Sequence, residues 1–272
     1  MEEPSMIRQK LKKAARKIRR AILRDEPGYY DMFMNKGEHF FGRLYLHEIT
    51  RILEEEKRNP PLKILDAGCQ SGRLTVPLAA AGHDVTGVDT SDLALRRARK
   101  HAAEMKTSFR PVRADLSSWL PKQPQGFFDA VLCTEVLYMR ENHLELLEGL
   151  LKVLKPGGLC FISHRPTGYY LAEAFRKGDK QAIETLTGAS EGILFGSYYN
   201  WQSREELRTL YSRFPVEVLS IVPIGFLSWA VIDPSGLEPE MEELLFQVET
   251  APEHRQNDCG RYLLVSARKK TS

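Results

Sequence analysis

Acids and glycines between residues 64 and 89 have the types and spacing most suited to chemistry in this chain. Asp66 follows an apolar stretch, Gly68 and Gly72 come next, and a second apolar stretch ends on Asp89, 23 positions after Asp66. Glycine lacks a Cβ and accepts positive φ, so the backbone of such a turn can approach a ligand closely. An acid that ends the second strand can accept hydrogen bonds from both hydroxyls of a ribose. These residues therefore predict a nucleoside site.

The apolar pattern predicts the elements that must position these residues. The stretch before Asp66 predicts a buried strand, the glycines a tight turn, and the residues after the turn a helix that leads to a second strand. The spacing also excludes one class of ligand. A dinucleotide fingerprint requires G-x-G-x-x-G, but counting from Gly68 the second and third glycine positions hold Gln70 and Arg73.

The spacing that is present, D-x-G-x-x-x-G, resembles motif I of the class I S-adenosylmethionine (SAM) dependent methyltransferases. Their usual form is D-x-G-x-G-x-G, and here Gln70 takes the place of the middle glycine. In that family the loop backbone lies against the methionine part of the cofactor. The resemblance therefore implies SAM as the cofactor. The residues expected to bind it are Asp66, Gly68, Gln70, Gly72, Asp89, Thr90, Asp115, Leu116 and Thr134.

Further blocks in the family's order strengthen the resemblance. A strand-like stretch over residues 108–119 carries Asp115, which the family places beside adenine, although an Asx-type turn also explains an aspartate there. An apolar strand over residues 129–133 opens into a polar loop. The helical pattern from residue 143 is expected to stop at a Pro-Gly-Gly turn, with Gly157 as terminator, before a strand over residues 159–166.

The resemblance implies a fold as well as a cofactor. We expect a Rossmann-like α/β domain with a seven-stranded, mostly parallel sheet of order 3-2-1-4-5-7-6, flanking helices and a small helical cap. The domain is expected over residues 25–272, with residues 165–201 as the cap. A structureless loop of that length is unusual in a compact domain. Helical patterns at residues 169–177 and 180–187 therefore favour a cap insertion.

Two residues are candidates for catalysis on the acceptor side. His164 follows the fifth predicted strand, and the ordinary pKa of histidine suits a base at neutral pH; a structural hydrogen bonder is the alternative. Glu135 is expected near the methionine end of SAM, or it satisfies loop amides. Because SAM carries an activated methyl group, alignment is the first task of the protein, and a base is needed only where the acceptor must lose a proton.

The acceptor is expected to be a small molecule. Methyltransferases acting on nucleobase amines typically carry N/D-P-P-Y/F after the fourth strand, where this chain has Cys133-Thr134-Glu135-Val136. The chain is similar instead to the methyltransferase type 11/12-like bacterial enzymes that methylate quinones and other metabolites at O, N or C atoms. Several aromatic residues are expected either to line an acceptor pocket under the cap or to pack in the core. They are Tyr169, Tyr170, Tyr198, Tyr199, Trp201, Phe226 and Trp229.

Residues 1–24 differ from the rest of the chain in charge. They contain nine Lys or Arg against two Glu, a net charge of +7, whereas the whole chain has +3. Their apolar residues recur at helical spacing, which predicts a basic amphipathic helix. Such a helix could be solvated, lie on an anionic membrane surface or bind nucleic acid. Close behind it, Tyr29 or Tyr30 is expected either to cover the SAM site or to pack against the domain.

Composition restricts the class of protein. Hydrophobic residues make up 42% and charged residues 28% of 272 residues, which suits a packed domain. No apolar run approaches the length of a membrane span, and no apolar signal core is present at the N-terminus, so we expect a cytoplasmic protein, with peripheral membrane association through residues 1–24 as an option. The four cysteines lack C-x-x-C spacing and are expected to be free thiols. We expect no metal site.

Three functions remain open from the sequence alone. The first is a SAM-dependent methyltransferase with a small-molecule acceptor. The second is an RNA or protein methyltransferase that holds its polymer with residues 1–24. The third is a SAM-binding regulator without catalytic activity, which the loss of the middle glycine at Gln70 would allow. The oligomeric state and the acceptor atom have no motif that would identify them.

Overall fold

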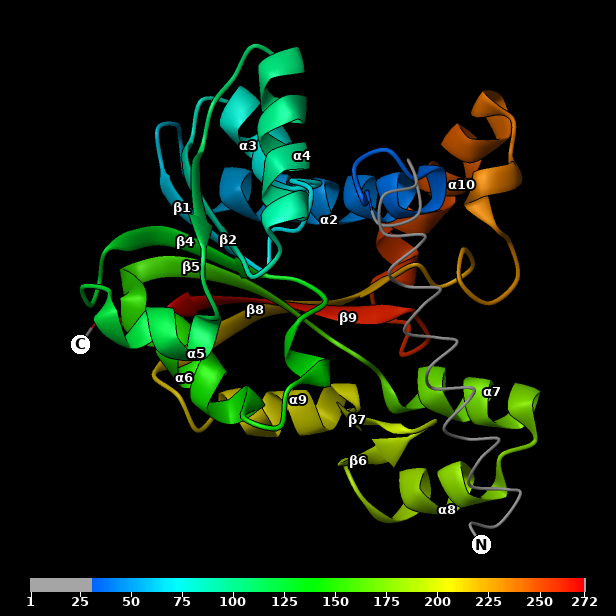
Figure 1. Cartoon of the computed structure of the whole chain (residues 1–272). Coiled ribbons are helices and arrows are strands. Elements are labelled where there is room, and N and C mark those ends of the chain that lie inside the picture. Colours follow the sequence, from blue (N-terminus) through cyan, green and yellow to red (C-terminus); the bar gives the residue numbers. More distant parts are fainter. Residues whose placement is uncertain (1–30, 272) are drawn as a thin grey trace, which may run out of the picture.

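The computed structural model describes residues 31–271, and the basic segment 1–24 and Tyr29 and Tyr30 lie outside the described residues. Seven strands form one sheet of order β3-β2-β1-β4-β5-β9-β8, as Figure 1 shows. The seven strands are β1 (Lys63–Ala67), β2 (Asp84–Asp89), β3 (Arg110–Arg113), β4 (Phe128–Cys133), β5 (Leu154–His164), β8 (Val216–Ile224) and β9 (Tyr262–Lys269). β9 runs antiparallel to both of its neighbours and the other pairings are parallel, which confirms the predicted order and direction.

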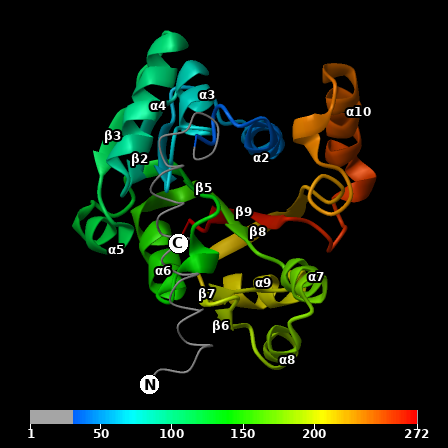
Figure 2. The same cartoon turned by 45° about the vertical axis from the view of Figure 1, so that its right-hand side comes forward.

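Helices cover both faces of the sheet. The helices beside the sheet are α2 (Lys36–Glu55), α3 (Thr75–Ala80), α4 (Asp92–Glu104), α5 (Leu116–Trp119), α6 (His143–Val153), α9 (Arg204–Tyr211) and α10 (Pro239–Thr250). In Figure 1, α2, α3 and α4 lie on one side and α5, α6 and α9 on the other. Figure 2 shows α10 beside α2, where Arg43 is ion-paired with Glu242 at 3.0 Å.

The alternation of the strands produces two apolar layers. Ile64 packs on the face that α2 covers, and its neighbour Leu65 packs on the face that α6 covers. Successive side chains of a strand point to opposite faces, so a strand buried on both sides is apolar throughout. The strand ends are therefore the place where polar side chains such as Asp66 and Asp89 can reach a ligand.

The end of α6 differs from the prediction. The helix stops at Val153, and Leu154 already pairs with Phe128 of β4. The next pair is Ala130 with Leu159, so four residues of β5 lie opposite one residue of β4 between the two pairs. Gly157 (φ +74°) is one of these four residues. The Pro-Gly-Gly turn is thus a bulge in the sheet and not the terminator of the helix.

The predicted cap region contains both expected helices and one element that was not predicted. α7 (Thr167–Lys177) and α8 (Lys180–Gly188) are followed by a hairpin of β6 (Glu191–Leu194) and β7 (Ser197–Asn200). Figure 2 shows these four elements grouped away from α3 and α4. Only the sequence pattern assigns residues 165–201 the role of a cap, and that assignment stays a prediction.

Gly72 has a packing role that the sequence did not indicate. Its φ is +87°, and a Cβ at this position would lie 2.8 Å from Val76 Cγ2 and 3.1 Å from Ala98 Cβ of α4. The residue therefore lets the glycine turn pass against α4. This explains its identity without any contact to a cofactor.

We predict that Gly72→Ala lowers the free energy of unfolding by about 2–3 kcal/mol, because the substitution combines a left-handed backbone with overpacking. Urea denaturation measures the difference. Gly168→Ala in α7 is the matched control, since nothing lies within 4 Å of its Cβ position. A helical alanine there should be neutral or stabilising by up to about 1 kcal/mol. Equal effects of the two substitutions would contradict the packing role.

Candidate active site

A cavity of about 430 Å³ lies beyond the carboxyl ends of β1, β2 and β4. Eight of the nine residues expected to bind SAM line it, and Gly72 is the exception. The eight are Asp66, Gly68, Gln70, Asp89, Thr90, Asp115, Leu116 and Thr134. Their shared position shows that the sheet brings them together, while their contact with a cofactor stays a prediction. We call this space the first cavity.

Asp89 is held in place by backbone amides of the turns around it. Its Oδ2 accepts a hydrogen bond from the Gln70 N–H at 3.0 Å, and its Oδ1 accepts one from the Ser91 N–H at 2.8 Å. An ionised carboxylate has about four acceptor positions, so each oxygen keeps one for a further donor. The side chain is oriented before any ligand binds and can still accept from a diol.

Gln70 shows what the middle glycine position requires. Its φ is +46°, so the backbone adopts the left-handed conformation although a side chain is present, at a cost of about 1 kcal/mol. The side chain of Gln70 makes hydrogen bonds that compensate for this cost. Its Oε1 accepts from the N–H groups of Met32, at 3.5 Å, and Ser71. The departure from the family's motif therefore retains the loop conformation.

Asp66 is buried at the base of the first cavity, with 2% of its surface exposed. The hydroxyl of Thr75 donates to its Oδ2 at 2.6 Å. Burial raises the pKa of the Asp66 carboxyl to about 6, and the hydrogen bond from Thr75 opposes part of this effect. The carboxylate is thus costly to ionise in the absence of a cation beside it.

Asp115 forms the Asx-type turn that the sequence allowed, and its expected contact with adenine stays a prediction. Its Oδ1 accepts from the Ser117 N–H at 2.9 Å as the N-cap of α5, which is an Asx-type turn, and the residue also lines the first cavity. Its Oδ2 is 2.9 Å from Nη2 of Arg140. The pKa of Asp115 is lowered, because these hydrogen bonds outweigh the effect of burial.

A segment before α2 closes one side of the first cavity, and the sequence analysis missed it. Met32 lines the cavity, and the N–H of Phe33 donates to Ser71 Oγ at 3.1 Å. The Phe33 ring stacks on His101 of α4 with 4.4 Å between centroids, and His101 Nε2 is 2.9 Å from Asp31 Oδ2. The partners are 70 positions apart in sequence, and no local motif links them.

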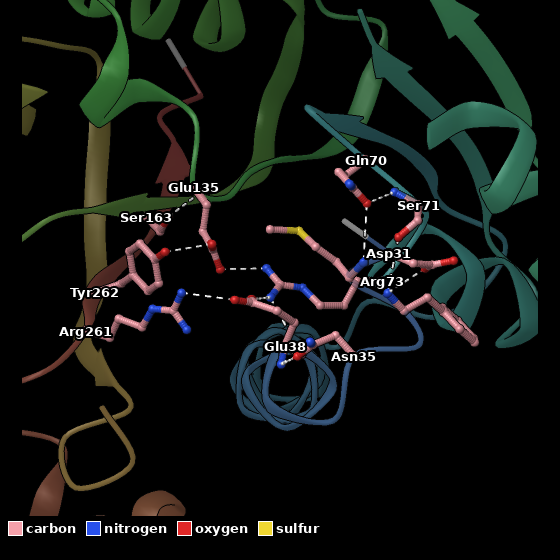
Figure 3. A network of polar contacts seen from close by, with 12 residues as sticks. Asp31, Asn35, Glu38, Gln70, Ser71, Arg73, Glu135, Ser163, Arg261 and Tyr262 are labelled. Atoms are coloured by element: carbon pink, nitrogen blue, oxygen red, sulfur yellow. Dashed lines mark hydrogen bonds and ion pairs between the residues drawn. The ribbon is translucent and has the colours of Figure 1, made fainter. Parts of the chain in front are cut away.

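Glu135 lines the first cavity, but both of its carboxylate oxygens are engaged. Arg73 donates to Oε1 at 2.6 Å, and the Tyr262 hydroxyl donates to Oε2 at 2.7 Å, as Figure 3 shows. Burial alone would raise the pKa of Glu135, but Arg73 and Arg261 together lower it below its ordinary value. An ionised carboxylate with two strong donors is a poor proton acceptor, so the geometry favours a structural role.

His164 does not line the first cavity, and its contacts favour the structural alternative over a base. The residue is 2% exposed, and its Nε2 is hydrogen-bonded to the Tyr211 hydroxyl at 3.0 Å. Burial lowers the pKa of His164 to about 3. A side chain at a strand end points to one face of the sheet or the other. The side chain of His164 points to the face that α9 covers.

A chain of ion pairs forms one side of the first cavity. Arg73 Nη1 is 2.8 Å from Glu38 Oε2, and the other oxygen of Glu38 is 3.0 Å from Arg261 Nη2. Together with the pair between Arg73 and Glu135, this makes the sequence Glu135, Arg73, Glu38, Arg261 that Figure 3 displays. We call these four residues the charged wall.

A second cavity of about 570 Å³ lies on the other side of the charged wall. Glu38 and Arg261 line it, with Tyr169 and Glu173 from α7 and Trp229 from the segment after β8. Of the aromatic residues expected in an acceptor pocket, only Tyr169 and Trp229 line this cavity. Tyr170 and Trp201 belong to the buried core, and the others lie outside both cavities.

Within residues 31–271 we find no cluster of three or more His, Cys, Asp or Glu side chains that could hold a metal ion. In the same range no helix is both long and apolar enough to cross a membrane. The four cysteines are free, and three of them are buried. Burial raises the pKa of the Cys133 thiol, which keeps that thiol protonated.

Comparison with known proteins relates this chain to methyltransferases. Residues 64–158 match a family described as a methyltransferase domain. A ubiquinone biosynthesis O-methyltransferase of Caulobacter vibrioides is 38% identical over 104 residues, which cover 38% of this chain and 40% of that protein. Across this and similar relatives the matched part spans 40% to 57% of the relative's own length.

Solved structures of class I SAM-dependent methyltransferases share the fold. A SAM-dependent methyltransferase of Methanosarcina mazei has a TM-score of 0.57 at 18% identity, covering 81% of this chain and 98% of that one. A magnesium protoporphyrin IX methyltransferase of Synechocystis with bound S-adenosylhomocysteine (SAH) has a TM-score of 0.57 at 17% identity, covering 98% and 99%. The Rossmann-like methyltransferase fold expected from the sequence is confirmed.

We predict that the buried Asp66 makes the stability of the cofactor-free protein depend on pH. Its pKa is raised in the folded state, so between about pH 4 and pH 6 unfolding allows the carboxyl to ionise, and stability falls as pH rises through this window. Relative to Asp66→Asn, the protein should lose about 2–3 kcal/mol of unfolding free energy between about pH 4 and pH 7.5. Urea denaturation at both pH values measures this. The exposed Asp84→Asn is the control, and a pH-independent difference for Asp66→Asn would refute the prediction.

Proposed function

We propose that this protein is a SAM-dependent methyltransferase that binds its cofactor in the first cavity and transfers the methyl group to a small-molecule acceptor. The observation that carries the proposal is the position of Asp89, oriented by two backbone amides, in a cavity that the glycine turn also lines. The match of residues 64–158 to a methyltransferase domain supports it. The curated relatives act as ubiquinone biosynthesis O-methyltransferases, which favours a small-molecule acceptor for this chain.

The residues of the first cavity suit SAM. A Cβ at Gly68 (φ +88°) would lie 2.3 Å from Val136 Cγ2. Only glycine therefore lets the loop lie this close to Val136. Asp89 suits the ribose diol, and Asp115 with Leu116 suits the adenine end. Asp66 and Glu135 supply negative charge at the methionine end. When bound, SAM supplies a methyl group activated by a sulfonium.

The contribution of the chain to the reaction is alignment and exclusion of water. Met32 covers the first cavity from the side of α2, and Glu135 and Arg73 form another side of it. A fixed approach of the reacting atoms accounts for much of the rate of such a transfer. Since neither His164 nor Glu135 is free to take a proton, we propose that neither acts as a base.

An RNA or protein acceptor is the second candidate, and the observation behind it is the net charge of +7 in residues 1–24. Deleting these residues separates the options. A nucleic-acid partner predicts binding that weakens steeply with salt and a slope that shrinks in the deleted protein. An anionic membrane partner predicts loss of flotation with anionic liposomes. A cytoplasmic location stays a prediction.

We predict that Asp89→Ala weakens SAM binding at least about 100-fold, because two hydrogen bonds to an ionised carboxylate are lost at about 1.5–3 kcal/mol each. Isothermal titration calorimetry measures the affinity, and a thermal melt verifies that the variant folds. Asp92→Ala is the control, since this partly exposed aspartate on α4 lies outside the first cavity. Unchanged affinity in Asp89→Ala would remove the basis of the proposed function.

A second experiment asks which molecules receive the methyl group. The protein is incubated with methyl-labelled SAM and a cell extract, and small molecules, RNA and protein are then separated. We expect label in the small-molecule fraction. Label in RNA or protein would support the second candidate, and SAM binding without label in any fraction would favour a regulator without catalysis.

A further inference from the structure

Four arginines line a cavity of about 320 Å³ at the edge of the sheet, and this cavity shares no lining residue with the first or the second cavity. The four are Arg51, Arg204, Arg208 and Arg255. Residues 218–222 of β8 and Gln256 complete the lining. Among residues 31–271, no aspartate or glutamate lines it. We call this space the arginine pocket.

The four arginines come from three separate segments of the chain. Arg51 belongs to α2, and Arg255 belongs to the segment after α10. Arg204 and Arg208 lie one turn apart on α9. In Figure 1, α2 and α9 lie on opposite faces of the sheet, so side chains from both helices can meet only around its edge. That edge is β8, the last strand in the order of the sheet, and the cluster is therefore a product of the topology.

Two of the arginines have contacts that explain their positions without a ligand. Both Nε and Nη2 of Arg51 donate to the carboxylate of Glu48, at 2.8 and 2.5 Å. Arg204 is 7% exposed, and its Nε donates to Asp258 Oδ1 at 2.6 Å. Its Nη1 donates to the carbonyl of Ile221 in β8. Charged side chains are a common protection of an edge strand, and these two arginines serve that purpose.

Arg208 and Arg255 have no such contacts. Within residues 31–271, neither guanidinium forms an ion pair or a side-chain hydrogen bond, although Arg255 is half-buried. Like charges gathered around one cavity repel one another, and an anion bound between them would remove this repulsion. A guanidinium also presents a planar pair of donors that matches two oxygens of a phosphate. These two side chains are therefore available to a ligand from outside the chain.

We propose that the arginine pocket binds a small phosphorylated compound, a phosphate monoester or a diphosphate, through Arg208 and Arg255. A phosphate monoester carries about 1.5–2 negative charges and three terminal oxygens, which suits two guanidiniums better than the single charge of a carboxylate. The volume suits a small ligand, since such sites begin at about 300 Å³. The inference does not rest on the proposed function, because the arginine pocket and the first cavity are separate.

Carboxylates around the arginine pocket favour a compact ligand over an extended polyanion. The side chain of Asp258 is 71% exposed and that of Glu55 is 59% exposed, and each pairs with an arginine of the pocket without lining it. They would repel the phosphates of a nucleic acid or of a membrane surface that lay across the pocket. The net charge acts in the same direction, because +3 for the chain and +7 for residues 1–24 leave −4 for residues 25–272.

Inorganic pyrophosphate is the probe for the test. It is titrated into the full chain by isothermal titration calorimetry, with sodium chloride keeping the ionic strength constant. We expect a dissociation constant below about 1 mM and a melting temperature that rises with pyrophosphate concentration. Saturating SAH should leave the dissociation constant unchanged. Absence of binding, or competition with SAH, would overturn the proposal.

Variants identify the residues that bind the probe. Arg208→Gln and Arg255→Gln should each weaken pyrophosphate binding about ten-fold, because each removes a charge-assisted pair with the anion. Arg99→Gln is the matched control, since this exposed arginine of α4 does not line the pocket. A thermal melt verifies the fold of each variant. Unchanged affinity in Arg208→Gln and Arg255→Gln would mean that pyrophosphate binds elsewhere, and would contradict the proposal.

Sedimentation with vesicles distinguishes a free phosphate compound from a lipid headgroup. The full chain and the double variant Arg208→Gln/Arg255→Gln are mixed with phosphatidylcholine vesicles that contain phosphatidic acid. Equal sedimentation of the two proteins, including none, is expected for a small soluble ligand. Sedimentation that the double variant loses would instead assign the arginine pocket to a lipid headgroup and overturn the proposal.

Discussion

The buried ion pair between Arg73 and Glu135 is the interaction on which the rest of the site depends. Arg73 comes from the glycine turn and Glu135 from the loop after β4, and each is less than a tenth exposed. Taking two charges out of water is favourable only when the remaining donors and acceptors find partners. Glu38 of α2 and Tyr262 of β9 supply them here. The same contacts that satisfy the pair therefore fix α2 and β9 against the ends of the central strands.

This arrangement explains why the space at this end of the sheet has two compartments. The ion pairs stand between a cavity lined by the residues expected to bind SAM and a cavity lined by aromatic and polar side chains from α2, α7 and the segment after β8. It also explains why the charged residues nearest to both compartments are poor proton acceptors. Their lone pairs are already used to hold the elements together, and catalysis by alignment is the chemistry that such a rigid frame can supply.

The elements that the sequence predicted well are those governed by local pattern. The strand that ends at Asp66, the strand that ends at Asp89 and the two helices of the predicted cap region appear where the spacing placed them. The errors arose where long-range pairing competes with local pattern. The helix before Gly157 stops early, because pairing with β4 recruits the following residues into the sheet. The position of His164 at a strand end made it a candidate for the site, but that position does not say to which face of the sheet the side chain points.

The sequence by itself determined the fold and most of the residues that meet around the first cavity, because apolar periodicity and a glycine turn are local properties of consecutive positions. It could not show the ion pairs of Arg73 and Arg261 with Glu38 and Glu135, since these residues are separated by up to 223 positions and no spacing rule relates them. Nor could it distinguish Gly72, which packs against α4, from Gly68, which opens the cavity. Only the tertiary structure decided these points, because the balance of buried charge and the space left for a Cβ depend on which distant segments meet.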